Sequence, residues 1–146
     1  MSIDLQIRPY RADDKSRLLL IWRAASEVGH PFFSKDQLDE QQRLVGEVYL
    51  SIAETWVAQD DGEPVGFIGL LDSFIGGLFV SPEAHGRGIG RALIAHALER
   101  KHSLELEVYA RNENAVGFYR RLGFFEVDRR PTDDNSLPFE VIRLRR

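Results

Sequence analysis

Residues 77–94 read Gly-Leu-Phe-Val-Ser-Pro-Glu-Ala-His-Gly-Arg-Gly-Ile-Gly-Arg-Ala-Leu-Ile and constrain the architecture more than any other part of the chain. A short apolar run ends at Ser81-Pro82, glycines follow at 86, 88 and 90, and an amphipathic helical pattern begins. Glycine permits close backbone approach, and the first N–H groups of a helix are unpaired and partly positive. The stretch therefore predicts a strand, a turn and a helix start that bind a diphosphate-bearing ligand.

The spacing of the glycines separates the known kinds of phosphate loop. A dinucleotide-binding fingerprint needs a third glycine three residues after the second, and the two ways of counting place Arg91 or Leu93 there. A P-loop needs Gly-Lys followed by Ser or Thr, which the chain lacks. Both kinds of loop are excluded. The remaining alternative to a diphosphate site is a glycine-rich connector with no ligand.

Composition bounds the class of protein. A length of 146 residues suits one domain, 1–146, and 43% hydrophobic residues suit a soluble one. A net charge of −4 argues against a nucleic-acid partner. The absence of cysteine excludes disulfides and thiolate chemistry, and the four histidines share no metal-ligand spacing, so no metal is expected. Residues 1–6 show no leader peptide and no run reaches about 20 apolar residues, which predicts a cytoplasmic chain without membrane contact.

Periodicity and turn residues predict the order β-α-α-β-β-β-α-β-α-β-β. The expected elements are a strand at 6–8, helices at 12–28 and 34–49, strands at 55–59, 64–71 and 74–80, a helix at 88–102, a strand at 104–109, a helix at 114–122, and strands at 124–130 and 139–144. Antiparallel hairpins then lie beside one βαβ crossover. We expect an α+β fold with a mixed, mostly antiparallel central sheet and helices on both faces.

A second motif, Asn112 to Phe124, reads Asn-Glu-Asn-Ala-Val-Gly-Phe-Tyr-Arg-Arg-Leu-Gly-Phe. Together with Val80-Ser81-Pro82 and the glycine run, it resembles the GNAT superfamily of acyl-CoA-dependent N-acetyltransferases over residues 56–125. The resemblance implies transfer of acetyl from acetyl-CoA to a primary amine by direct attack. The amine could belong to a small molecule, a protein N-terminus or a lysine, and a longer acyl chain is a further possibility.

The resemblance also assigns residues to the donor. The strand main chain of Leu78, Phe79 and Val80 would bind the pantetheine arm, and Asn112 would contact that arm near its thiol. The residues that would wrap the diphosphate are Gly86, Arg87, Gly88, Ile89, Gly90 and Arg91. His85 stands where the family usually has Gln or Arg, although imidazole can still donate a hydrogen bond.

Tyr119 matches the family's general acid. A phenol with a pKa of about 10 can protonate a thiolate whose thiol has a pKa of about 8.5. The base is less clear, because strand 74–80 has no acid where many members carry glutamate. Glu107 matches the acid of the ribosomal-protein alanine acetyltransferases. His30, with its near-neutral pKa, and a water chain are the alternatives.

The acceptor is expected between connector 29–33 and loop 130–138, with His30, Phe32 and Phe33 as candidate contacts. Asp133 and Asp134 would attract cationic amines if they faced the cleft, but a solvated loop is the simpler interpretation. The missing acid in strand 74–80 leaves a second hypothesis, a non-catalytic acyl-CoA-binding or regulatory domain. Intact Tyr119 argues against it. The oligomeric state, monomer or homodimer, is left open.

Overall fold

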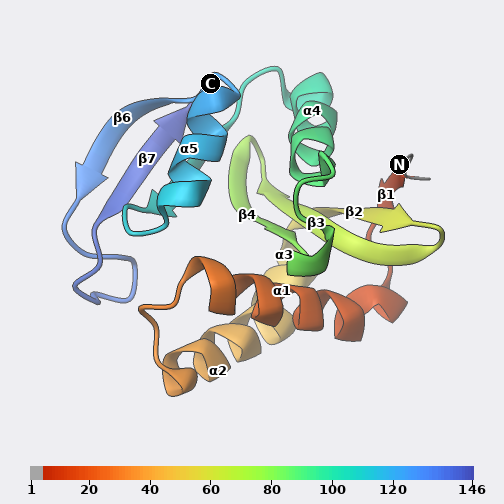
Figure 1. Cartoon of the computed structure of the whole chain (residues 1–146), viewed down its shortest axis with the longest axis horizontal. Coiled ribbons are helices and arrows are strands. Elements are labelled where there is room, and N and C mark those ends of the chain that lie inside the picture. Colours follow the sequence, from red (N-terminus) through yellow and green to blue (C-terminus); the bar gives the residue numbers. More distant parts are fainter. Residues whose placement is uncertain (1–4) are drawn as a thin grey trace.

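The computed structural model describes residues 5–146, so part of the segment behind the leader-peptide expectation, residues 1–4, lies outside the described residues (Figure 1). One sheet of seven strands runs in the order β1-β2-β3-β4-β5-β7-β6. Its strands are β1 (Leu5–Pro9), β2 (Glu54–Asp60), β3 (Glu63–Leu71), β4 (Phe74–Val80), β5 (Glu105–Tyr109), β6 (Phe125–Arg130) and β7 (Val141–Arg145). The helices are α1 (Lys15–Gly29), α2 (Lys35–Leu44), α3 (Leu50–Ile52), α4 (Ile89–Lys101) and α5 (Glu113–Arg121).

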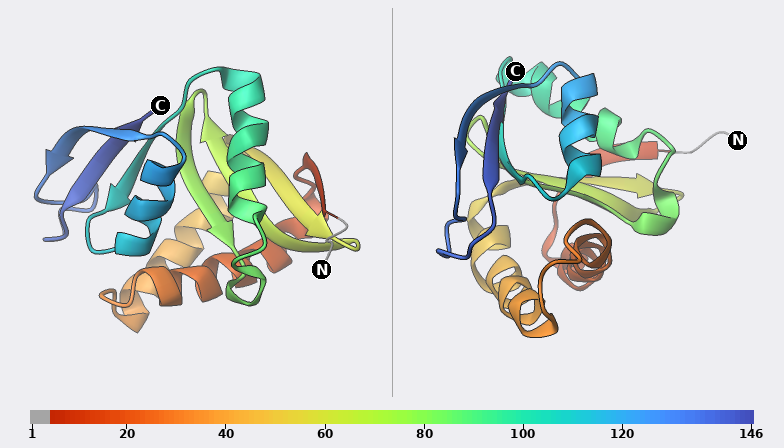
Figure 2. Two further views of the ribbon diagram at one scale, coloured as in Figure 1. Left: turned by 45° about the horizontal axis from the view of Figure 1, so that its top comes forward. Right: turned by 60° about the vertical axis from the view of Figure 1, so that its left-hand side comes forward.

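The expected fold class and element order are confirmed. Neighbouring strands pair antiparallel except β4 and β5, which pair in parallel across the α4 crossover. Helices α1 and α2 lie on one face of the sheet, and α4 and α5 lie on the other (Figure 2). Across residues 5–146, no helix has both the length and the apolar character that a membrane crossing requires.

Local sequence signals explain where several elements begin and turn. Ser34 starts α2 because its hydroxyl accepts the Gln37 N–H at 3.1 Å while the Gln37 side chain accepts the Ser34 N–H at 2.8 Å. Asp61 and Gly62 join β2 to β3 with φ of 51° and 83°, the backbone conformation that suits a tight hairpin. The second helix ends later than expected. After α2 it changes to a π-helical turn, Val45–Tyr49, and then continues past Tyr49 as α3.

Two apolar clusters hold the helices to the sheet. The first lies between the sheet and helices α4 and α5, and Leu93, Leu104 and Leu106 are among its fully or almost fully buried members. The second lies beneath α1 and α2, and contains Leu18, Trp22 and other large side chains. Each buried Leu or Phe contributes roughly 1.5–3 kcal/mol, so both faces of the sheet are covered by helices that apolar burial fixes.

The central strands separate in the middle of the sheet. Strand β4 pairs with β5 only through Phe74↔Glu105 and Ile75↔Leu106, whereas its pairing with β3 continues to Gly66↔Val80. A register shift opposite Gly76 marks the point where β4 bends. Within residues 5–146, the facing edges of β4 and β5 beyond these two pairs therefore have no strand partner. The gap exposes backbone N–H and C=O groups inside the protein.

Tyr49 fills the space that two glycines leave on the α2 side of this bend. A Cβ at Gly69 would lie 2.2 Å from the Tyr49 hydroxyl oxygen, and a Cβ at Gly76 would lie 2.3 Å from it. Only glycine fits at either position. The hydroxyl is buried without a hydrogen-bond partner in the described chain, and burial raises the pKa of Tyr49.

We predict that Tyr49→Phe raises the free energy of unfolding by about 1 kcal/mol, because it removes a buried hydroxyl that makes no hydrogen bond. Urea denaturation monitored by circular dichroism measures the change. Tyr10→Phe serves as the matched control and should leave stability unchanged, because Tyr10 is partly exposed. A loss of stability in Tyr49→Phe would show that the hydroxyl has a partner.

Candidate active site

A cavity of about 1000 Å³ occupies the gap between β4 and β5. Trp22 and Ser26 of α1 line it from one face of the sheet, and Ile89 of α4 lines it from the other, so the cavity passes through the sheet. The expected site residues that line it are His30, Leu78, Phe79, Val80, Gly86, Gly88, Ile89, Gly90, Arg91, Glu107, Asn112 and Tyr119. Sequence reasoning did not anticipate the contribution of α1 and α2, whose amphipathic stripes were the only signal.

The free edge of β4 can accept an extended ligand. Leu78 and Val80 pack toward the cluster under α4, while Phe79 packs on the other face, 6.2 Å from the Trp22 ring centroid. Because the strand is held on both faces and by β3, its unpaired edge is rigid. A chain of amide groups, such as a pantetheine arm, fits there as an additional strand.

The glycine turn leads into α4 with three backbone N–H groups unpaired within the helix. Gly86 and Gly88 have φ of 81° and 79°, and a Cβ at either would meet nothing within 4 Å. Glycine is therefore needed for backbone conformation and not for space. The N–H groups of Ile89, Gly90 and Arg91 precede the first α4 hydrogen bond, from Ala92 to Gly88, and so remain available for a diphosphate.

Two side chains in this turn behave differently from simple anion ligands. The Arg87 side chain does not line the cavity; it lies 3.8 Å from a carboxylate oxygen of Asp60. His85 lines the cavity, and its Nε2 donates a hydrogen bond to the Val80 carbonyl at 2.9 Å. The residue that departs from the family pattern thus fastens the turn to the end of β4.

Tyr119 enters the cavity from the α5 side. Its ring packs edge-on against Phe118 at 5.1 Å and Phe124 at 5.5 Å between ring centroids, and it is only 8% exposed. Burial raises its pKa, so the phenol keeps its proton at neutral pH. The geometry provides a fixed O–H donor at the cavity wall.

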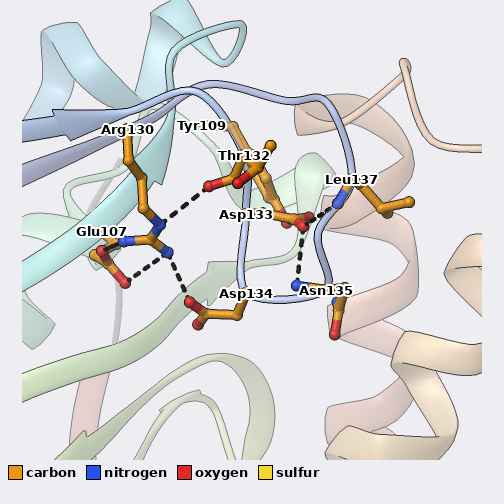
Figure 3. A network of polar contacts seen from close by, with 8 residues as sticks. All are labelled: Glu107, Tyr109, Arg130, Thr132, Asp133, Asp134, Asn135 and Leu137. Carbon is orange, nitrogen blue, oxygen red and sulfur yellow. Dashed lines mark hydrogen bonds and ion pairs between the residues drawn. The ribbon is translucent and has the colours of Figure 1, made fainter.

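Glu107 enters from the opposite face. Leu106 and Val108 point into the cluster under α4 and α5, so Glu107 and Tyr109 face the α1 side. Arg130 of β6 donates to both Glu107 carboxylate oxygens and also to Asp134 at 2.7 Å (Figure 3). The ion pair fixes the carboxylate in position. No sequence motif signalled Arg130, because its partner is 23 residues away on another strand.

Asp133 is an exception in the expected solvated loop, most of whose other residues are exposed. It is 7% exposed and accepts N–H groups from Asn135 at 3.0 Å and Leu137 at 2.9 Å, as well as the Tyr109 hydroxyl at 2.9 Å (Figure 3). This one carboxylate folds the loop between β6 and β7. Asp134, whose side chain is 84% exposed, is consequently held at the cavity wall.

Phe32 and Phe33 were expected to contact the acceptor, but neither lines the cavity. They belong to an aromatic group with Phe139 and with Tyr109, which does line the cavity, and this group packs around His30. His30 does line the cavity, and burial lowers its pKa to about 4. It is therefore neutral at pH 7.

Three comparisons with known proteins agree with this geometry. Residues 51–126 match the family model described as Acetyltransferase (GNAT) domain. The chain is 36% identical over 141 residues to the peptidyl-lysine N-acetyltransferase YjaB of Salmonella typhimurium LT2, covering 96% of this chain and 97% of that protein. The solution structure of apo YjaB from Escherichia coli superposes with a TM-score of 0.89, at 34% identity, over 97% of this chain and 96% of that one.

A more distant neighbour shows the same fold with its cofactor. The PaiA N-acetyltransferase of Thermoplasma acidophilum, solved in complex with coenzyme A, has a TM-score of 0.78 and 19% identity, covering 98% of each chain.

The low pKa of His30 predicts a component of acid instability. The unfolded chain binds a proton at His30 below about pH 6.5, whereas the folded chain binds it only near pH 4, so stability falls as the pH drops between these values. From pH 7 to 4.5, wild type should lose about 2 kcal/mol more than His30→Gln does. Urea denaturation of both proteins at the two pH values measures this difference. Equal losses would contradict the burial of a neutral imidazole.

Proposed function

The chain belongs to the GNAT acetyltransferase family, and we propose that it transfers acetyl from acetyl-CoA to the ε-amino group of lysine side chains in proteins. The acceptor is supported by the YjaB relative, which is named as a peptidyl-lysine N-acetyltransferase and matches nearly the whole chain. Within the structure, the observation that carries the proposal is the distribution of charge along the cavity wall.

Charged residues of opposite sign reach the cavity from different elements. Helices α4 and α5 contribute Arg91 and Arg121, beside the turn whose N–H groups suit a diphosphate. Strand β5 and the β6–β7 loop contribute Glu107, Asp133 and Asp134, of which Arg130 pairs directly with only two. This second region carries net negative charge and favours a cationic acceptor such as lysine.

Acetyl-CoA supplies a thioester whose carbonyl carbon forms a bond to the amine nitrogen as the carbon–sulfur bond breaks. Tyr119 then provides the proton for the departing sulfur from the α5 face, and the second proton that the amine nitrogen loses as the amide forms restores the Tyr119 phenol through water. The lysine ammonium, with a pKa of about 10.4 in water, must first lose a proton, and Glu107 on the α1 face is the carboxylate placed to receive it directly or through water. The cavity holds both reactants together, which supplies the benefit of proximity.

The acid that strand 74–80 lacks is thus provided by the adjacent strand. Glu107 reaches the same gap from β5, because the separation of β4 and β5 exposes side chains of both strands to one cavity. The missing acid in strand 74–80 is therefore no longer an argument for a non-catalytic domain. The family model that matches describes an acetyltransferase.

We predict that a lysine-containing peptide with a blocked N-terminus is acetylated by acetyl-CoA, with thiol release and mass spectrometry as readouts. A matched peptide with arginine in place of lysine and a free N-terminus should not react. Acetylation confined to the free N-terminus would contradict the lysine proposal.

Tyr119→Phe should lower kcat at least tenfold and change the KM for acetyl-CoA little, because the lost proton donor acts only as the sulfur departs.

The role of Glu107 is separable from its ion pair. We predict that Glu107→Gln lowers kcat about tenfold or more and flattens the acidic limb of the pH–rate profile. Arg130→Gln breaks the same ion pair but leaves the carboxylate, so its kcat should fall less. Equal losses in the two variants, with unaltered pH profiles, would assign Glu107 a structural role and leave deprotonation to water.

A further inference from the structure

We infer that His30 is a positioning residue that orients the Asn112 amide at the cavity wall by accepting a hydrogen bond from it. The inference deepens the proposed function and rests on it only in so far as Asn112 contacts the donor. The two residues lie 82 positions apart in the sequence, His30 at the end of α1 and Asn112 at the start of α5. Both line the same cavity.

The helix cap fixes which end of the Asn112 amide faces His30. Asn112 Oδ1 accepts the N–H of Ala115 at 3.3 Å and so caps α5. The Nδ2 group is therefore the end that lies 3.4 Å from His30 Nε2. An amide nitrogen has two N–H donors, so the second remains free for a ligand in the cavity.

This arrangement determines where the imidazole carries its proton. Asn112 Nδ2 can only donate, so His30 Nε2 must be unprotonated to accept. A neutral imidazole then carries its proton on Nδ1, which is buried and has no partner within residues 5–146. Burial favours this neutral form throughout the physiological pH range.

The residues around His30 hold its ring beside the Asn112 amide. Gly29 leaves the necessary space, because a Cβ there would lie 3.1 Å from Asn112 Nδ2. The imidazole ring packs edge-on against Phe32, Phe33 and Tyr109, with ring centroids 5.6, 5.8 and 5.1 Å away. Phe32 and Phe33 thus affect the cavity from behind its wall, by holding the ring that holds Asn112.

Three variants separate hydrogen bonding from packing. His30→Gln places an amide oxygen near the original Nε2 and keeps an acceptor for Asn112. His30→Asn keeps an amide but is too short to reach. His30→Phe preserves the ring shape among its aromatic neighbours and removes the acceptor. If His30 acts only by packing, the Phe variant should bind acetyl-CoA more tightly than the Gln variant. If His30 positions Asn112, the Gln variant should bind acetyl-CoA more tightly than both the Phe and the Asn variants.

The first readout is the dissociation constant of acetyl-CoA by calorimetry, which needs no acceptor, and the second is the kcat and KM with a lysine peptide. His30→Phe and His30→Asn should weaken acetyl-CoA binding about three- to tenfold, the range of one lost hydrogen bond, while His30→Gln stays within about twofold of wild type. In an Asn112→Ala background, His30→Phe should have no further effect, because the positioned group is gone. Nitrogen-15 NMR of the ligand-free protein should show the His30 proton on Nδ1.

Several results would overturn the inference. These are a Gln variant as weak as the Phe variant, independent effects of His30→Phe and Asn112→Ala, or a proton on Nε2. A wild type that binds acetyl-CoA but acetylates no lysine peptide would instead refute the proposed acceptor. The order of acetyl-CoA dissociation constants among the three His30 variants would still decide the role of His30.

Discussion

Two backbone pairs, Phe74 with Glu105 and Ile75 with Leu106, hold β4 to β5, and the site depends on the pairing ending there. Had the ladder continued, the edges of both strands would be saturated with hydrogen bonds and the sheet would be closed. Because it ends, backbone groups that would be costly to bury unpaired face the cavity, where they are available to pair with a ligand. The α4 and α5 helices on one face and α1 and α2 on the other hold the opened strands in place (Figure 2).

Side-chain contacts between segments that are separated in sequence build the cavity wall. His30 meets Asn112, Tyr109 meets Asp133, and Glu107 meets Arg130 across strands and loops that are far apart in sequence. Each contact involves a residue that lines the cavity. Two of these contacts join β5 to β6 and to the β6–β7 loop, and the third, between His30 and Asn112, joins the end of α1 to the start of α5.

The sequence predicted the features that arise from local rules. The apolar periods, the Ser34 cap and the Asp61-Gly62 hairpin each depend on neighbours in the chain, and they located the elements within a few residues. The glycine turn was readable for the same reason. The Glu107–Arg130 pair, the burial of Asp133 and the placement of Phe32 behind the wall depend on which strands and loops become neighbours, and residue identity alone does not record that.

The π-helical turn at Val45–Tyr49 sets how far the second helix rotates before it meets the sheet. A π turn holds about one residue more than an α turn, so the same residues wound as a regular α-helix would rotate the downstream residues by about 100°. Tyr49 would then leave the space between Gly69 and Gly76, and the bend in β4 would lose its support. In this fold, the bend in β4 is thus coupled to the winding of a helix that does not belong to the sheet.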